Sequence, residues 1–246
     1  LALWTFTGGV ARYVELLMTA GAFTRLEMIR SIFGRLTAFL EEGKIVLMEE
    51  FGSDYSTYFS ILSSIASGHA KFAEIANDLG VEVGTYLANL NEKYELISRV
   101  RPYLDREKSK NSVYRIEDCF FRFWFRFVFK YQSMITLNRH EQLQELVDRD
   151  FSVFSGYALE RYFHWKMVCE STCTQMGGWW DRKGENEIDL ICEDELAGTM
   201  DFYEVKVDRG RFNRKLLETK VEAFFEKHPE KRNLERRLGL LSLKDM

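Results

Sequence analysis

Cysteine is scarce in this chain, and the few cysteines present do not form a recognisable motif. The four cysteines include no Cys-x-x-Cys pair and have no histidine at ligand spacing, which argues against a zinc site. We expect reduced thiols and a cytoplasmic location rather than a disulfide framework. Cys169 and Cys173 would share a helix face if the helix before them continues that far. The cysteines are Cys119, Cys169, Cys173 and Cys192.

Long apolar runs are missing as well. The most apolar stretch, residues 119–129, is shorter than the ~20 apolar residues that a spanning helix needs. Arg122 and Arg126 interrupt it, and their spacing of four places them on one face of a helix. We therefore expect a buried helix between domains and no membrane partner.

An excess of positive charge is also absent. The chain has 34 Lys and Arg against 38 Asp and Glu, for a net charge of −4. This balance argues against a uniformly basic coat for nucleic acid but allows local basic patches. A hydrophobic content of 46% with 15% aromatic residues supports buried cores. The 246 residues suffice for one large domain or for two to three small ones.

Charged residues interrupt two apolar runs near the C-terminus. Asp189 lies in the run 188–192, and Glu204 and Lys206 lie in the run 202–207. Side chains alternate along a strand, so Glu204 and Lys206 point to the same face. If the runs form a hairpin, two carboxylates and a lysine converge, as a magnesium-dependent phosphodiester-cleaving site requires. The alternative is a cross-strand surface ladder, with Asp189 capping a turn.

A helical pattern at residues 154–165 adds a third carboxylate, Glu160. A helix with Glu160, a strand with Asp189 and a strand with Glu204-x-Lys206 together resemble the PD-(D/E)XK phosphodiesterase superfamily. The resemblance implies that Asp189 and Glu204 hold Mg²⁺, that Glu160 supports them, and that Lys206 orients water or stabilises the transition state. The nearby Trp179-Trp180 pair would either stack on bases or pack against the sheet.

Residues 53–117 show the order of a winged helix-turn-helix. Helical patterns at 58–67, 70–79 and 83–93 are followed by strand patterns at 96–104 and 113–116. Such a domain binds duplex DNA or packs against a protein partner. The third helix is not basic, so we do not expect sequence-specific readout, and phosphate contacts are expected from the wing and from the segment after the Glu-x-Lys strand. The candidates for these contacts are Arg99, Arg101, Arg106, Lys108, Lys110, Arg209 and Arg211.

The first 52 residues show helical patterns at 10–20, 24–33 and 36–42, the last ending before Gly43. Gly8-Gly9 with Tyr13 resembles the opening of the helical lid in archaeal-type DEXX-box AAA+ ATPases, and Arg12 matches a nucleotide-sensing arginine there. No G-x-x-x-x-G-K-[ST] phosphate loop exists in the sequence. We therefore expect no ATP hydrolysis by this chain alone, and a role for ATP only in an intact protein carrying the missing core.

The order of these segments resembles the C-terminal part of an archaeal-type ATPase. The predicted fold class is α+β with several domains. The predicted function is nucleic-acid binding, DNA favoured, with a Mg²⁺-dependent nuclease domain. The alternative is an inactive nuclease fold and winged helix that bind DNA or a protein. The expected segments are a lid remnant at 1–52, a winged helix at 53–117, aromatic-rich connecting helices at 118–150 and a restriction-endonuclease-like α/β domain at 151–246.

Overall fold

The chain folds into two compact units. The structure is a computed structural model that describes residues 1–34, 37–107 and 109–246. The first unit comprises residues 1–100 and 113–152, and the second comprises residues 101–112 and 153–246. Helices and a mixed sheet are both present, so the predicted α+β class is confirmed.

The first unit is mainly helical. None of the helices in the described ranges is long and apolar enough to cross a membrane. Helix α10 begins in this unit and continues into the second. The elements are α1 (Ala2–Thr7), α2 (Ala11–Thr19), α3 (Arg25–Gly34), α4 (Thr37–Phe51), α5 (Tyr55–Ala66), α6 (Phe72–Leu79), α7 (Gly84–Glu92), β1 (Ile97–Val100), β2 (Val113–Ile116), α8 (Cys119–Phe123), a π-helix (Trp124–Phe129), α9 (Gln132–Thr136) and α10 (His140–Glu170).

Aromatic side chains from α1, α2 and α8 form much of this unit's core. The Tyr13 ring stacks on Phe120 at 4.1 Å between centroids, and Phe6 meets Phe123 edge-on at 5.0 Å. Asp118 caps α8 by accepting a hydrogen bond from the Phe121 amide. The predicted helix at 119–129 is therefore present, as α8 followed by the π-helix.

The Gly8-Gly9 pair has a local structural role. Both residues adopt positive φ, 60° and 80°, which side-chain-bearing residues rarely adopt. A Cβ atom on Gly8 would lie 3.2 Å from a carboxylate oxygen of Asp118, the α8 cap. The glycines let the α1–α2 turn pack closely within the first unit.

The prediction that a helix ends before Gly43 is wrong. Helix α4 continues through Gly43 to Phe51. The indole of Trp124 lies 2.9 Å from where a Gly43 Cβ would stand, and its Nε1 donates to the Leu40 carbonyl oxygen at 2.8 Å. Glycine is needed here for the close approach of an aromatic ring, not for a helix end.

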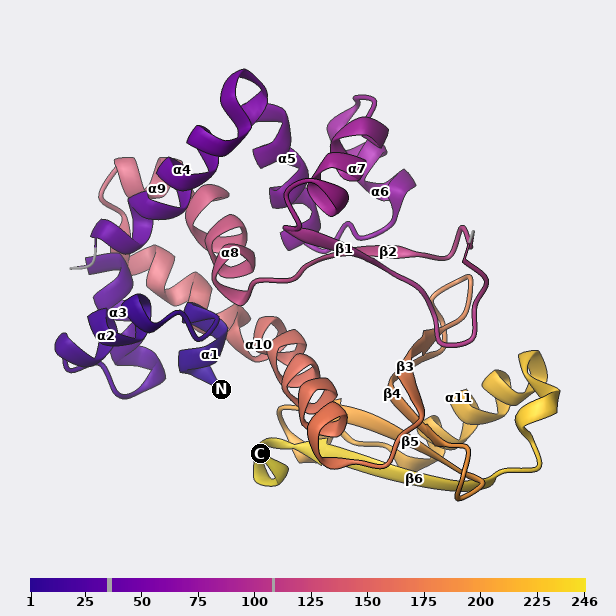
Figure 1. Cartoon of the computed structure of the whole chain (residues 1–246). Coiled ribbons are helices and arrows are strands. Elements are labelled where there is room, and N and C mark those ends of the chain that lie inside the picture. The colour runs from indigo at the N-terminus through magenta and orange to yellow at the C-terminus, as the bar shows by residue number, and fades with distance from the viewer. Residues whose placement is uncertain (35–36, 108) are drawn as a thin grey trace. The chain divides into compact units, whose positions relative to one another are not determined.

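Helices α5, α6 and α7 precede the short β1–β2 hairpin in the predicted order, and Figure 1 shows them grouped beside it. The strands are antiparallel, with Ile97 opposite Ile116 and Val100 opposite Val113. Residues 101–112, which join the two strands, belong to the second unit.

The second unit is built on a four-stranded sheet, visible at the C-terminal end of the ribbon in Figure 1. The strand order is β3-β4-β5-β6, with antiparallel pairs except for the parallel β5–β6 pair. Helix α11 makes the crossover between the parallel strands and packs Phe224 and Val221 against Phe202 and Ile191. The elements are β3 (Gln175–Trp180), β4 (Glu187–Asp194), β5 (Thr199–Lys206), α11 (Arg214–Lys227) and β6 (Glu235–Ser242).

The segment 101–112 is held on this sheet by hydrogen bonds at both ends. The Tyr103 amide donates to the Gly178 carbonyl oxygen at 2.7 Å, and its hydroxyl donates to Glu193 Oε2 at 2.6 Å. Asn111 Nδ2 donates to the Trp180 carbonyl oxygen, and the Trp180 indole donates back to the Asn111 carbonyl. The segment is therefore a structural part of the second unit.

The expectation of four reduced cysteines is wrong for two of them. Cys173 and Cys192 form a disulfide with Cα atoms 5.5 Å apart. Helix α10 ends at Glu170, so Cys173 does not share a helix face with Cys169. Cys173 instead lies between the end of α10 and the start of β3, whereas Cys192 lies on β4, so this pairing is a tertiary effect that the cysteine spacing does not encode. Cys119 is buried and Cys169 is exposed, and neither takes part in this disulfide.

Candidate functional site

Asp189, Glu204 and Lys206 meet on adjacent strands. In the β4–β5 register Leu190 is opposite Tyr203, so Asp189 and Glu204 are the next pair and lie on one face of the sheet. The Lys206 Nζ lies 3.1 Å from Asp189 Oδ2 and 2.7 Å from Glu204 Oε2. The two carboxylates thus converge on one ammonium group, and the predicted hairpin is confirmed.

A backbone contact fixes the Asp189 carboxylate. Its Oδ2 accepts a hydrogen bond from the Val205 amide at 2.7 Å. Both carboxylates are nearly removed from solvent, with side-chain exposures of 10% for Asp189 and 6% for Glu204. Buried carboxylates need charged or hydrogen-bonding partners, so this is not a solvated surface ladder.

A second lysine completes the cluster. Lys220 projects from α11, and its Nζ pairs with Glu204 Oε1 at hydrogen-bonding distance. The Lys220 side chain is 13% exposed. Nothing in the sequence pattern distinguishes it from a lysine on a solvated helix face, and for that reason it was not among the predicted site residues. We call Asp189, Glu204, Lys206 and Lys220 the carboxylate–lysine cluster.

The ionisation of the cluster follows from its contacts. Burial alone would raise the pKa of Glu204, but the ammonium groups of Lys206 and Lys220 hold it below its ordinary value. Burial alone would lower the pKa of Lys206, but Asp189 and Glu204 raise it. These shifts keep Glu204 ionised as a carboxylate and Lys206 ionised as an ammonium group at neutral pH.

The donor atoms of the cluster match what a hard divalent cation prefers. Mg²⁺ is commonly bound through one or two carboxylates while keeping several waters. Here the two carboxylates are held side by side, but Lys206 Nζ lies between them. A divalent cation shared by both carboxylates would have to displace this ammonium group.

Glu160, the third predicted carboxylate, lies half-buried on α10 in the second unit. Within the described ranges, no group of three or more His, Cys, Asp or Glu side chains is arranged to hold a metal ion. The structure therefore brings together the two strand carboxylates with Lys206, and the supporting role of Glu160 stays a prediction.

A second buried charge cluster lies at the other end of the same sheet face. Asp189, Ile191 and Glu193 occupy every second position of β4, so their side chains lie on one face of the sheet, the face that α11 covers. Glu193 is 2% exposed and pairs with Lys231 Nζ at 2.6 Å as well as with the Tyr103 hydroxyl. Apolar side chains including Phe202 separate the two clusters. The Glu193 cluster anchors the segment 101–112 through the Tyr103 hydroxyl.

The predicted phosphate-contacting residues fall into two groups. Arg101, Arg106 and Lys110 are exposed on the segment 101–112, Arg99 is exposed on β1, and Lys108 lies outside the residues that the structure describes. Arg209 and Arg211 are exposed on the connection between β5 and α11. Arg209 pairs with Asp245 at 3.2 Å and Arg211 with Asp208 at 3.9 Å.

In the third helix of the predicted winged helix, two asparagine side-chain amides form hydrogen bonds within the first unit. Asn89 Nδ2 donates to the Tyr58 hydroxyl at 2.9 Å, and Asn91 Oδ1 accepts from the Arg99 amide at 3.1 Å. Its exposed positions include Glu92 and Lys93, which do not form a basic surface. Arg12, the predicted nucleotide-sensing residue, is exposed on α2.

The idea that Trp179 or Trp180 stacks on bases is wrong for both rings. Trp179 is 1% exposed and Trp180 is 6% exposed. Trp179 packs edge-on against Phe224 in the core of the second unit. The alternative of packing against the sheet is the one that holds, because β3 buries both indoles.

A serine, a histidine and an aspartate meet in the first unit, which sequence spacing did not reveal. Ser64 Oγ donates to Asp78 Oδ2 at 2.6 Å, and His69 Nδ1 lies 3.2 Å from each of these oxygens. A catalytic triad needs the serine to donate to the imidazole and the aspartate to hold the opposite ring nitrogen. Here one ring nitrogen faces both partners, so the cluster links the ends of α5 and α6.

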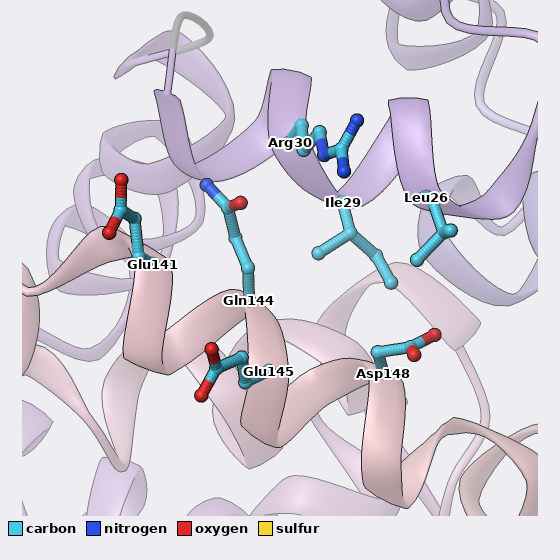
Figure 2. A pocket seen from close by; sticks show the side chains of 7 residues that line it. All are labelled: Leu26, Ile29, Arg30, Glu141, Gln144, Glu145 and Asp148. Atoms are coloured by element: carbon cyan, nitrogen blue, oxygen red, sulfur yellow. The ribbon is translucent and has the colours of Figure 1, made fainter.

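A groove in the first unit has the wrong charge for a phosphodiester. It lies between α3 and the start of α10 and has a volume of about 350 Å³. Figure 2 shows Glu141, Glu145 and Asp148 along one wall and Arg30 on the other. Three acids against one arginine would repel a polyanion. The carboxylate–lysine cluster is therefore the better candidate for phosphate chemistry.

Comparison with known proteins adds a family for the central part of the chain. Residues 124–222 match DUF234, a family of archaeal and bacterial proteins of unknown function. The DUF234 domain is associated with archaeal ATPase-like proteins. The match spans the π-helix through most of α11, and so includes all four members of the carboxylate–lysine cluster.

A curated relative is an uncharacterized protein of Methanocaldococcus jannaschii. It is 32% identical over 182 residues, which cover 70% of this chain and 40% of the relative. The chain therefore spans less than half the length of this relative. No solved structure matches the chain.

Proposed function

We propose that the DUF234 region carries a Mg²⁺-dependent phosphodiesterase site that acts on nucleic acid, with DNA favoured. The observation that carries the proposal is the convergence of buried Asp189 and Glu204 on Lys206 across β4 and β5. Two buried carboxylates beside a lysine match the chemistry implied by the PD-(D/E)XK resemblance. The order of α10, then β4 with Asp189, then β5 with Glu204-x-Lys206 also supports it.

Each residue has a role in this proposal. Asp189 and Glu204 would hold the cation, with Glu160 in support. When bound, Mg²⁺ supplies positive charge against phosphate oxygens and increases the acidity of water. Lys206, once released from the carboxylates, would present its ammonium group to the charge that develops on the phosphate. The near absence of solvent around the carboxylates would strengthen each of these interactions.

Exposed arginines and lysines of the second unit would hold the nucleic-acid backbone. Arg101, Arg106 and Lys110 lie on a segment that hydrogen bonds fix to the sheet carrying the site. Arg209 and Arg211 follow directly after β5, which carries Glu204 and Lys206. Contacts of this kind bind phosphates without reading the sequence, so we expect strongly salt-dependent binding.

A second candidate function is binding without cleavage. Its supporting observation is that Lys206 and Lys220 already neutralise both carboxylates. In that case helices α5–α7 with the β1–β2 hairpin would act as a winged-helix module for DNA or for a protein. The absence of a basic surface on α7 favours the protein partner. In a protein that also carries an AAA+ ATP-hydrolysing core, either function would be coupled to ATP hydrolysis.

The test is cleavage of plasmid and single-stranded DNA with Mg²⁺ or Mn²⁺. We expect cleavage by the wild type, loss of cleavage in Glu204→Gln and Lys206→Met, and no change in Lys244→Met, which removes an exposed charge. Salt-dependent DNA binding without cleavage under any of these conditions would favour the second candidate. Cleavage that persists in both site variants would exclude this site as its source.

A further inference from the structure

The carboxylate–lysine cluster has more positive charge than a cation site requires. One ammonium group, that of Lys206, already contacts both carboxylates. Lys220 adds a second charge from a different element, α11, and contacts Glu204. A divalent cation is bound most tightly where uncompensated negative charge gathers, and each fixed ammonium group opposes it.

The position of Lys220 separates it from Lys206. Lys206 follows Glu204 by two residues on β5, so both side chains stay on one face whatever occupies the site. Lys220 comes from the second turn of a helix whose Leu217 and Val221 are buried in the core of the unit. Because the helix is anchored on both sides of residue 220, the Lys220 ammonium group is carried to Glu204 by the packing of α11.

We propose that Lys220 is a built-in counter-ion of Glu204 that competes with a divalent cation for this carboxylate. This inference rests on the proposed metal-dependent function. Without a cation, Lys220 neutralises Glu204 Oε1 while Lys206 neutralises Oε2. A cation that takes Glu204 must release at least one of the two ammonium groups. Lys220 therefore sets how much divalent cation the site needs, and it acts as a positioning residue rather than a catalytic one.

The competition predicts that removing the Lys220 charge tightens cation binding. Lys220→Met keeps the length of the apolar stem, whereas Lys220→Arg keeps the charge. Mn²⁺ and Mg²⁺ affinities would be measured by titration calorimetry and by the dependence of the unfolding temperature on cation concentration. We expect Lys220→Met to bind about tenfold more tightly than the wild type, equivalent to ~1.4 kcal/mol. Lys220→Arg should bind as the wild type does.

Two further variants make the result specific. Lys215→Met removes an exposed charge from the same helix and should leave the affinity unchanged, which controls for net charge. Asp189→Ala in the Lys220→Met background should abolish the added binding, which places the cation at this cluster. If Lys220→Met does not fold, Lys220→Gln removes the charge while keeping a hydrogen-bond donor.

The outcomes separate this inference from the proposed function. Tighter binding in Lys220→Met, or binding that appears in this variant alone, supports the competition. Unchanged or weaker binding in Lys220→Met, with cation binding by the wild type, overturns it and leaves the metal site intact. No cation binding in the wild type, in Lys220→Met or in Lys220→Gln overturns both the competition and the metal-dependent function.

Discussion

The buried contact between Tyr103 and Glu193 provides the sharpest test of how the second unit is assembled. The Tyr103 hydroxyl donates to Glu193 Oε2 at 2.6 Å, and Glu193 is 2% exposed. Burial and the adjacent Glu193 carboxylate raise the pKa of Tyr103 far above its ordinary value, so the phenol stays a donor throughout the working pH range. Tyr103→Phe removes this hydroxyl and little else.

The expected cost follows from the charge of the acceptor. A hydrogen bond to a charged group stabilises a fold by ~1.5–3 kcal/mol. Glu193 would keep its ion pair with Lys231 at 2.6 Å and would not become an isolated buried charge. We therefore expect Tyr103→Phe to lower the free energy of unfolding of the second unit by ~2 kcal/mol. The backbone hydrogen bond from the Tyr103 amide to the Gly178 carbonyl oxygen would open more often, because the hydroxyl no longer ties the segment 101–112 to Glu193.

Two measurements check this prediction. Urea denaturation gives the change in unfolding free energy, and amide hydrogen exchange reports the protection of the segment 101–112. Tyr162→Phe is the matched control, because it removes the same hydroxyl from a half-buried ring on α10. A Tyr103→Phe variant with an unfolding free energy within ~0.5 kcal/mol of the wild type, and with unchanged exchange in the segment, would show that the hydroxyl does not hold the segment on the sheet.

Three further predictions concern single contacts. Gly239→Ala should destabilise the second unit by ~1–3 kcal/mol, because the new Cβ would lie 2.6 Å from the Tyr203 ring. The double variant Gly239→Ala/Tyr203→Ala should recover part of this loss, and denaturant midpoints of both variants check the prediction. Burial and the neighbouring Asp201 raise the pKa of Tyr203 to about 12 from an ordinary 10.0. Because the unfolded chain loses this proton at a lower pH than the folded chain, the stability of the wild type should fall above pH 10 more steeply than that of Tyr203→Phe. Parallel slopes of stability against pH in alkaline denaturation would contradict this prediction. Asp150→Asn should cost the first unit ~1 kcal/mol, because Arg126 lies 3.1 Å from this carboxylate in a partly buried pair; an unchanged unfolding temperature would show that the pair is fully screened.

Local alternation was enough to predict the strand part of the candidate site. Apolar runs interrupted by Asp189 and by Glu204-x-Lys206 carry a period of two, and a hairpin is the simplest way to bury them. The same reasoning placed both carboxylates and Lys206 on one face, as the structure shows. The period of the apolar positions likewise predicted the helices at 10–20, 24–33, 58–67, 70–79 and 83–93, whereas it did not predict α1.

Contacts between distant segments were not predictable from local pattern. The sequence pattern predicts that Lys220 is a solvated helix residue, because its partner, Glu204, lies on a strand 16 residues earlier. Tyr103 and Glu193 are 90 residues apart, so no spacing rule links them. The end of α4 was misplaced because Gly43 makes room for Trp124, which is far away in the sequence. The π-helix was also not predicted, because an almost wholly apolar run has no pattern that distinguishes an α-helix from a π-helix.

The proposed function depends on Asp189 and Glu204 holding one divalent cation beside Lys206. Anomalous diffraction from crystals of the protein grown with Mn²⁺ tests it most directly. We expect an anomalous peak in contact with both carboxylates, with the Lys206 ammonium group moved away from at least one of them. A peak elsewhere, or a cluster that keeps both lysines on the carboxylates at saturating Mn²⁺, would contradict it.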